Sequence, residues 1–493
     1  MREQKLGRIT RVRAAFVIGY ADGDHCIWPR GELVHEDDVV VFVGRGYEGR
    51  VDVEIDAGHA IVSPGFIDLN ALADIDHAIF DSWPTGDSRL GLAWSQEYLA
   101  GHGPVFTEEE ELFRRQFALS QLVRNGITTI MPIAAETYKP WCEDYADAAQ
   151  LAAAVTGIGL RAYLGPSYRT HVPYTDGTAT LLHEDEAKGL DGLAQAIQFC
   201  RDHEDTAGGL IRTALLPARI ETQTERTLKM TRAAADELGV PVRLHAAQGL
   251  FEVGEILART GLRPIPYLES IGFLKEKTFV PHAWTVPGHR HMPGHFGQGD
   301  DVKILAEHGT TVIFCPIPTA HYGVCLEDFD AYRAKGVRVV LGTDSAPPNM
   351  IRAMDLAMGM TKASTGDRTS AQSEDLYRAA TLDPAAALGR DDLGRLAAGA
   401  QADYFVLDLG GTHIGPHGDP VRTLVMNCDG RDVTRVVVAG RTVVEDKRIV
   451  TVETGSYAGR AQRFLEKYMA SFSLSDFRKR PTNELFPSSF PLR

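Results

Sequence analysis

The chain has 493 residues, and its 51 Lys and Arg against 66 Asp and Glu give a formal net charge of −15 at pH 7. Hydrophobic residues make up 44% and charged residues 24%, a mixture that predicts a sizeable core and excludes global disorder. The acidic balance argues against nucleic acid as the main partner, because phosphate binding needs a basic face. Small molecules are the expected partners.

The sequence predicts neither a membrane span nor a secretory signal. No run of 18 apolar residues occurs, and residues 1–24 lack the apolar core of a signal peptide. The cysteines form no Cys-x-x-Cys pair, which argues against a zinc knuckle or a redox dithiol. A reducing, cytoplasmic location fits this usage best. The six scattered cysteines are Cys26, Cys142, Cys200, Cys315, Cys325 and Cys428.

Short strand patterns separated by Gly and Asp occur near both ends of the chain. Because two separate groups of strands would leave open edges, we expect residues 1–63 and 391–454 to form one small composite β-sandwich domain. A helical extension is expected over 455–493, with its helix at 460–469. The expected strands are 11–20, 38–44 and 51–55 at one end, and 404–409, 433–438 and 441–444 at the other.

The middle of the chain alternates short apolar strands with amphipathic helices. Eight such units predict an α/β fold, a parallel (β/α)₈ TIM barrel over residues 64–390. Active sites of such barrels lie at the carboxyl ends of the strands. The expected strands are 61–68, 126–131, 160–164, 210–216, 242–245, 278–281, 311–314 and 337–341, with helices at 108–125, 190–203, 225–238 and 302–308.

Five motifs follow one another along the chain. They are Pro-Gly-Phe-Ile-Asp at 64–68, His245 and His282 after the fifth and sixth strands, Gly-Thr-Asp at 342–344, and a Gly-rich return to Asp at 394–403. With these motifs, residues 10–450 resemble the amidohydrolase superfamily, in particular its chlorohydrolase and aminohydrolase branch of triazine hydrolases and guanine and cytosine deaminases. The resemblance implies a hydrolase of carbon–nitrogen bonds other than peptide bonds, most like a deaminase of a small cyclic substrate, and a homodimer or larger homo-oligomer.

The resemblance also implies a metal site, from which this sequence departs. The family's usual ligands are a His-x-His after the first motif, the fifth-strand His and the eighth-strand Asp. Here Asn70 and Leu72 occupy the His-x-His positions, and Gln248 occupies the position of a proton-shuttling Glu. Leu has no donor atom, and Gln cannot transfer a proton at neutral pH. The expected cofactor is none, or one divalent zinc or iron ion held by His245, His282 and Asp344.

The remaining trio allows three interpretations. Two His and one carboxylate can bind zinc or ferrous iron with an open position for water. The same side chains can work as a metal-free acid–base set, or they can be inherited residues without a catalytic role. For an enzyme, the resemblance implies that Asp344 activates water, His282 stabilises the oxyanion or donates a proton, and His245 holds any metal. Alternatives to a hydrolase are a metal-free lyase or isomerase and a non-catalytic ligand-binding barrel.

Further candidates lie near the same strand ends. Asn70, Gln248, Arg169 and Trp83 are the expected substrate contacts. An Arg after the third strand can hold a carboxylate or carbonyl through two hydrogen bonds, although a surface Arg is equally compatible with the pattern. Trp83, with Trp94 and Tyr98, can form an aromatic wall for a planar ring or simply pack its loop.

Two further clusters carry weaker hypotheses. Asp74, Asp76 and His77 can supply groups that the missing ligands no longer provide, but Asp-rich turns usually face water. The loop around His289, His291 and His295 is dense in imidazole, yet it lacks a carboxylate or thiolate. A second metal site there is the less favoured interpretation.

Overall fold

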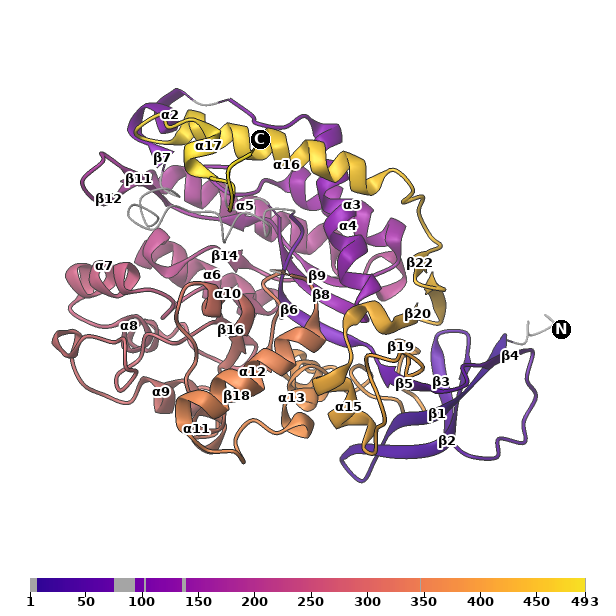
Figure 1. The fold of residues 1–493 in the computed structure, drawn as a ribbon. Helices are drawn as coiled ribbons and strands as arrows, with labels where there is room; N and C mark the ends of the chain where they lie inside the picture. Colours follow the sequence, from indigo (N-terminus) through magenta and orange to yellow (C-terminus); the bar gives the residue numbers. More distant parts are fainter. Residues whose placement is uncertain (1–6, 75–93, 102, 135–138, 346, 493) are drawn as a thin grey trace.

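The computed structural model describes residues 7–74, 94–101, 103–134, 139–345 and 347–492. Figure 1 shows a barrel surrounded by helices, a β-sheet at one side near the N-terminus, and a long C-terminal helix lying along the barrel. This arrangement agrees with the predicted α/β fold, a TIM barrel beside a small β domain.

The barrel consists of eight parallel strands in two groups of four, ordered β13-β9-β8-β6 and β15-β16-β17-β18. A parallel bridge between Leu215 and Val242 joins the groups on one side. On the other side the backbone N–H of Asp344 donates to the carbonyl of Asn70 at 2.8 Å. The strands are β6 (Phe66–Leu72), β8 (Ile127–Ile133), β9 (Arg161–Leu164), β13 (Ile211–Thr213), β15 (Val242–Arg243), β16 (Thr278–Pro281), β17 (Thr311–Phe314) and β18 (Arg338–Leu341).

Amphipathic helices connect these strands and cover the outside of the barrel. Local sequence sets their ends: Thr107 and Glu110 form a capping box at the start of α3, and Gly239 ends α6 with a positive φ of 71°. The main helices are α3 (Glu108–Arg124), α4 (Tyr145–Ile158), α5 (Glu186–His203), α6 (Glu225–Leu238), α7 (Leu250–Thr260), α8 (Pro264–Ser270), α9 (Asp301–Glu307), α10 (Pro316–His321), α11 (Phe329–Ala334), α12 (Met350–Thr365), α13 (Ser373–Ala379) and α14 (Leu382–Leu388).

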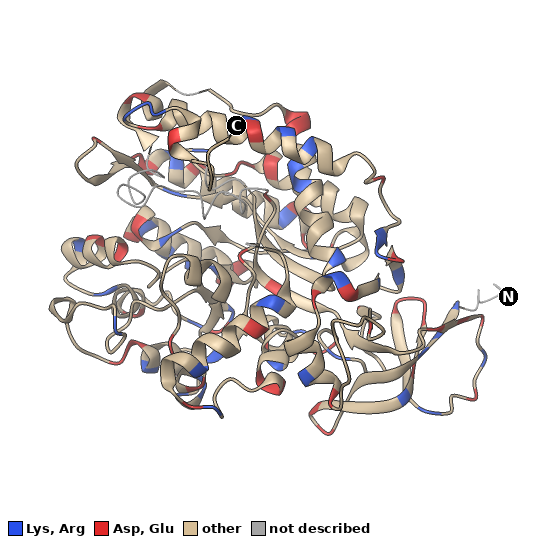
Figure 2. Cartoon of the chain, viewed as in Figure 1, with Lys and Arg blue, Asp and Glu red and all other residues tan. Residues whose placement is uncertain are grey.

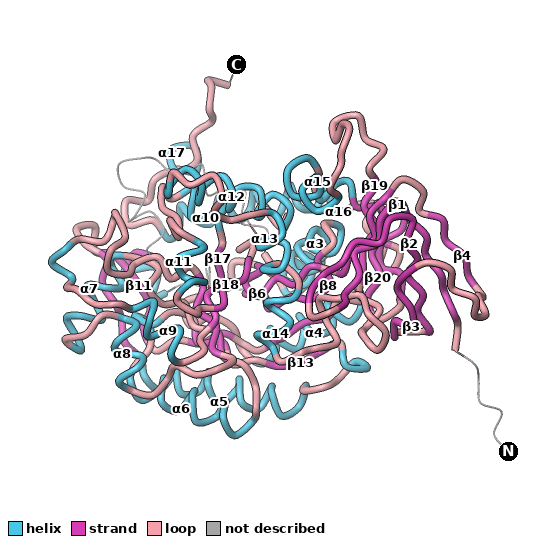
Figure 3. Tube along the Cα trace, turned by 90° about the horizontal axis from the view of Figure 1, so that it is seen from below, coloured by secondary structure: helices cyan, strands magenta, loops and turns pink. Residues whose placement is uncertain are grey.

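Strands from both ends of the chain pair in one nine-stranded sheet, ordered β22-β21-β20-β19-β5-β1-β2-β3 with β4 beside β1. Figure 3 shows them gathered at one side of the molecule. The pairing agrees with the idea of a composite domain, while the boundaries at 63, 390 and 454 stay predictions. The strands are β1 (Ile9–Ala21), β2 (Asp24–Glu36), β3 (Val39–Gly44), β4 (Val53–Asp56), β5 (Ala60–Pro64), β19 (Tyr404–Asp408), β20 (Val433–Val438), β21 (Arg441–Glu445) and β22 (Arg448–Ile449).

The first barrel strand differs from its predicted range of 61–68. The chain forms two strands there: β5 pairs with β1 and β19 in the sheet, and β6 pairs with β8 in the barrel. The break falls at Gly65, where a Cβ would lie 2.0 Å from Oγ1 of Thr128. Only a glycine leaves room for this close passage from sheet to barrel.

The C-terminal extension lies against the outside of the barrel. Helix α16 (Tyr457–Ser475) runs beside α3, followed by the short α17 (Thr482–Leu485) (Figure 1). The helix is longer at both ends than the predicted 460–469. A hydrophobic, mostly aromatic cluster joins α16 to the barrel, and within it the ring centroids of Phe106 and Phe464 are stacked 4.4 Å apart. This cluster consists of Phe106, Phe113, Phe464, Tyr468, Phe472, Leu485 and Phe486.

Charged residues of both signs are interspersed over the outer helices in the view of Figure 2, without a broad basic face on that side. Among the described residues, none of the helices combines the length and the apolar character that crossing a membrane requires.

Candidate active site at the barrel mouth

Three of the predicted site residues meet at the carboxyl end of the barrel. His245 follows β15, His282 follows β16 and Asp344 follows β18. The two imidazole rings have centroids 5.6 Å apart, and Nε2 of His282 lies 3.9 Å from Oδ2 of Asp344. Both histidines are buried, whereas the Asp344 side chain keeps 19% of its surface exposed. The fold therefore places a partly exposed carboxylate beside the imidazole of His282, which in turn lies beside that of His245.

The backbone at this end of the barrel is strained. His282 has a φ of 67° and Asp344 a φ of 45°, and positive values also occur at Ala247, Ala283 and Ser345. L-residues rarely adopt this left-handed conformation, which costs about 1–3 kcal/mol for each of them. Strained residues that follow three strands of the same four-stranded group are typical of a functional site.

His245 is held as a neutral imidazole. Burial, followed by the positive charges of Arg219 and Arg243, lowers its pKa well below the usual value. Its Nδ1 lies 3.0 Å from the carbonyl oxygen of Ala218. Because a carbonyl only accepts, Nδ1 carries the proton, and Nε2 keeps a lone pair for an incoming hydrogen-bond donor.

Arg243 is a part of this site that the motifs did not single out. It is buried inside the barrel, where Nη1 donates to the carbonyls of Leu69, at 3.2 Å, and Met131, and Nη2 donates to Pro132 at 3.3 Å. The side chain thus joins β15 to β6 and β8. Its signal in the sequence is a charged residue within an otherwise apolar strand directly before His245.

Asn70, one of the predicted substrate contacts, donates a hydrogen bond to Asp344. It is fully buried at the end of β6, and its Nδ2 donates to Oδ1 of Asp344 at 3.1 Å. The neighbouring Leu72 donates its backbone N–H to Oγ of Ser345 at 2.7 Å. Hydrogen bonds between protein groups therefore join the ends of β6 and β18.

These residues do not fit the family's His-x-His metal site. Leu72 offers no ligand atom, and the Asn70 side chain presents its NH₂ group to the Asp344 carboxylate. Within the described parts of the chain, no group of three or more His, Cys, Asp and Glu side chains is arranged to hold a metal ion. This finding covers the predicted set of His245, His282 and Asp344.

Gln248 lies in the loop between β15 and α7, and Glu252 fixes that loop. The buried Glu252 carboxylate accepts from the backbone N–H groups of Ala247, at 2.5 Å, and Gln248, at 2.9 Å. Burial, followed by the negative charge of Glu221, raises the pKa of Glu252 to about 8. Sequence reasoning assigned no role to Glu252, although its position in the first turn of α7 makes it a candidate for this contact.

Most of the chain matches the sequence pattern of one protein family. The match is to the Amidohydrolase family and covers residues 61–443. The chain belongs to the amidohydrolase family. The predicted class, a hydrolase of carbon–nitrogen bonds other than peptide bonds, is confirmed by this membership.

Relatives within this family are deaminases by name. The 5-methylthioadenosine/S-adenosylhomocysteine deaminase of Natronomonas pharaonis is 28% identical over 416 residues, which cover 84% of this chain and 88% of that protein. The enzyme of the same name from Pyrococcus furiosus is 26% identical over 460 residues, or 91% of this chain and 97% of that protein.

Solved structures share the fold at lower identity. An adenosine deaminase from Xanthomonas campestris with bound zinc has a TM-score of 0.73 at 20% identity, covering 93% of this chain and 98% of that one. A mutant atrazine chlorohydrolase from Arthrobacter aurescens TC1, complexed with zinc and atraton, has a TM-score of 0.76 at 19% identity, covering 92% and 100%. At such identities the likeness shows the fold alone.

Arg169, a predicted substrate contact, is buried and donates hydrogen bonds to backbone carbonyls. Its Nε donates to the carbonyl of Pro140 at 2.5 Å, and its Nη2 donates to that of Lys139 at 2.7 Å. The guanidinium also lies 5.9 Å from the ring centre of Trp94. Arg169 thus supports the segment after β8. Trp83, Asp76 and His77 lie outside the described residues.

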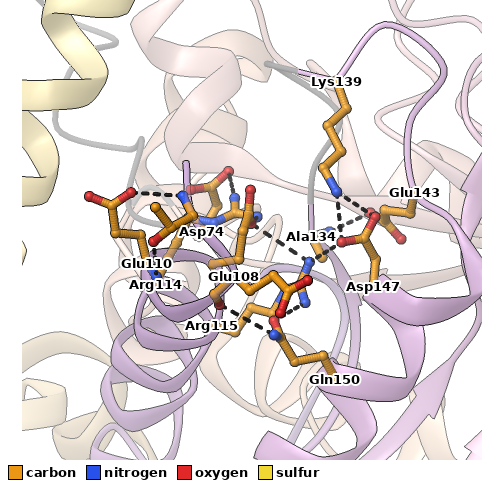
Figure 4. Close-up of polar contacts among 12 residues, drawn as sticks. Asp74, Glu108, Glu110, Arg114, Arg115, Ala134, Lys139, Glu143, Asp147 and Gln150 are labelled. Atoms are coloured by element: carbon orange, nitrogen blue, oxygen red, sulfur yellow. Dashed lines mark hydrogen bonds and ion pairs between the residues drawn. The ribbon is translucent and has the colours of Figure 1, made fainter. Parts of the chain in front are cut away.

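Asp74 lies in a buried ion-pair network (Figure 4). Its Oδ2 is 2.5 Å from Nη1 of Arg114, whose side chain is fully buried. The adjacent Arg115 pairs with Asp147 at 2.7 Å, and Lys139 pairs with the same carboxylate at 2.6 Å. The network connects the segments after β6 and β8 to α3 and α4, so the Asp74 carboxylate is already engaged in structural support.

The histidine-rich loop contains internal hydrogen bonds. Nε2 of His289 lies 2.9 Å from the carbonyl oxygen of Cys325, and the backbone N–H of His291 donates to Nδ1 of His289 at 3.1 Å. Both ring nitrogens of His289 therefore already take part in hydrogen bonds. The less favoured second metal site, which also included His295, is not assembled among the described residues.

Proposed function

We propose that this protein is a metal-independent deaminase-like hydrolase that replaces the amino group of a small nitrogen-containing ring with oxygen. The observation that carries the proposal is the meeting of His245, His282 and Asp344 on strained backbone at the ends of three barrel strands. The related deaminases act, by their names, on adenosine-type compounds, so purine nucleosides are the first substrates to test.

The proposed reaction starts with water beside Asp344. The carboxylate removes a proton as the water oxygen attacks the ring carbon that bears the amino group. His282, 3.9 Å from that carboxylate, stabilises the negative charge on the tetrahedral intermediate. The proton then passes from Asp344 to the amino nitrogen, the carbon–nitrogen bond breaks, and ammonia and a ring carbonyl are formed.

The other residues of the mouth bind and orient the substrate in this proposal. The neutral His245 offers its Nε2 lone pair to an N–H group of the substrate, and Asn70 and Gln248 supply side-chain amides. Arg169 acts through the segment that it supports, and Trp83 remains a proposed aromatic contact. Zinc is named for two solved relatives, but the side chains of this mouth favour a reaction without it. A single zinc or iron ion at His245, His282 and Asp344 is the alternative.

The test is a screen for ammonia release. We would incubate the purified chain with 5′-methylthioadenosine, S-adenosylhomocysteine, adenosine, guanine, cytosine, amino-triazines and cyclic amidines, and use Asp344→Asn as the matched control. Release that depends on Asp344 would support the proposal. Binding of these compounds without turnover would favour the non-catalytic barrel, and conversion without ammonia would favour a lyase or isomerase.

Two expectations about the cell accompany this proposal. All six cysteines are free thiols in the structure, which suits a reducing cytoplasm. A homodimer or larger homo-oligomer is proposed from the family resemblance, and sedimentation of the purified chain would test it.

A further inference from the structure

Two side-chain amide oxygens near the catalytic trio are buried without a hydrogen-bond donor. Oδ1 of Asn70 and Oε1 of Gln248 have no hydrogen-bond partner among the described residues. Water would satisfy both oxygens in the unfolded chain, so folding leaves two desolvated acceptors at a free-energy cost. A ligand with donor groups would remove that cost.

The orientation of the Asn70 amide follows from its neighbours. Its Nδ2 points at Oδ1 of Asp344, 3.1 Å away, and at Sγ of Cys315, 3.5 Å away. Turning the amide over would place its oxygen against the carboxylate, an unfavourable contact between two acceptors. The oxygen therefore has to be the atom left without a partner, although the residue is fully buried.

The second acceptor belongs to a loop that is held in place. Gln248 follows His245 by three residues, and the Glu252 carboxylate fixes its backbone N–H at 2.9 Å. The two imidazoles and Asp344 connect this loop to the end of β6, where Asn70 lies. The two free amide oxygens thus belong to residues on either side of the proposed reaction centre.

The charges around the site favour the same kind of ligand. Asp344 adds a partly exposed carboxylate, and His245 is neutral with an acceptor nitrogen available. The nearest arginines are engaged elsewhere, since Arg243 donates to barrel carbonyls and Nε of Arg219 donates to Glu221 at 3.0 Å. The acceptor atoms of Asn70, Gln248 and His245 therefore suit a ligand that donates hydrogen bonds.

We propose that Asn70 and Gln248 select a planar ligand that carries N–H donors at two positions, such as a diamino-substituted azine or a cyclic amidine. The inference rests on the proposed function for the reaction itself and adds the class of substrate. In this proposal the amide oxygens of Asn70 and Gln248 form a donor-reading pair, which means that each accepts a hydrogen bond from one N–H group of the ligand.

A matched pair of probes tests the inference without a need for turnover. We would measure the binding of 2,4-diaminopyrimidine and of 2,4-dimethoxypyrimidine by calorimetry, at a pH at which both rings are neutral. The two compounds share the pyrimidine ring and the positions of their substituents, but the methoxy groups cannot donate. The diamino compound should bind at least about tenfold more tightly, which corresponds to the loss of one good hydrogen bond.

Variants identify the residues responsible. Asn70→Ala and Gln248→Leu should each weaken binding of the diamino probe by about tenfold, whereas Gln198→Leu, a similar change on the exposed face of α5, should leave it unchanged. Gln248→Leu guards against a folding defect in Asn70→Ala, because Gln248 is only partly buried.

The outcomes separate this inference from the proposed function. Equal binding of the two probes, binding of neither, or binding that both variants leave unchanged would overturn the donor-reading role, even where another compound releases ammonia. Selective diaminopyrimidine binding lost in both variants would support it, even where no compound is hydrolysed and the deaminase proposal fails.

Discussion

Replacement of Asp344 by Asn is the change that most directly examines the proposed chemistry. In the native site Oδ1 of Asp344 accepts from Asn70 at 3.1 Å, and Oδ2 lies 3.9 Å from Nε2 of His282. An Asn side chain can keep its oxygen toward Asn70 and place its NH₂ group where Oδ2 was. Shape and the contact with β6 are preserved, and only the basic oxygen is lost.

The expected effect is on turnover and not on folding. Loss of a general base typically lowers the rate by about 10²–10⁴-fold, which corresponds to about 2.7–5.4 kcal/mol of transition-state stabilisation. We would measure kcat and KM for the substrate found in the ammonia screen, together with the free energy of unfolding in urea. The kcat should fall by this factor, while KM changes little and the urea midpoint stays close to that of the native protein.

Two further variants serve as controls for Asp344→Asn. His282→Ala should cost less than Asp344→Asn if the imidazole only stabilises charge, and Asp408→Asn, an exposed change at the end of β19, should cost nothing. If Asp344→Asn retains full turnover with an unchanged urea midpoint, water is activated by another group and the proposed mechanism is wrong.

Four further predictions concern the metal, the core and the pH response. Protein purified without chelator should contain less than one zinc or iron per chain by elemental analysis, since two ligand positions of the family pattern are lost; two tightly bound metals per chain would contradict this. Asp74→Ala should lower the free energy of unfolding by about 3 kcal/mol, because it leaves the buried Arg114 charge undercompensated, whereas Glu225→Ala breaks an exposed pair worth under about 0.5 kcal/mol; equal urea midpoints for the two variants would refute this account. Gly65→Ala should destabilise strongly through its 2.0 Å approach to a side chain, while Gly157→Ala, with open space around the site, should be neutral or stabilising. Folded Glu252, with its pKa of about 8 against an ordinary 4.5, holds its proton to higher pH than the unfolded chain does. The free energy of unfolding should therefore fall as the pH rises from about 4.5 to about 8, and it should fall less in Glu252→Gln; an equal fall in both proteins would contradict this assignment.

The barrel could be predicted because each of its units carries a local signal. Helix α6, predicted and found at 225–238, begins at a capping Thr and ends at a Gly with positive φ. The proximity of His245, His282 and Asp344 could be predicted for a related reason. Parallel strands end at one mouth, so residues directly after three such strands must lie close together.

Contacts between distant segments left no comparable signal. The sequence does not reveal that Arg169 supports the carbonyls of Lys139 and Pro140, because an Arg after a strand is also the pattern of a substrate contact. The ion pair of Asp74 with Arg114 spans two elements and is likewise invisible in an Asp-rich turn. The split at Gly65 depends on Thr128, a residue of the neighbouring strand.

Hydrogen bonds join the ends of β6 and β18 at the mouth of the barrel. A metal ion would hold the ends of β6 and β18 together and offset the charge of Asp344. Here the Asn70 amide donates to that carboxylate at 3.1 Å, and the Leu72 N–H donates to Ser345 at 2.7 Å. The amide partly replaces the electrostatic role of a cation, but it leaves the carboxylate basic and its own oxygen without a donor. The Asn70 amide is therefore part of both proposals. Its NH₂ group supports Asp344 as a base without a metal ion, and its oxygen is free to accept a hydrogen bond from a ligand.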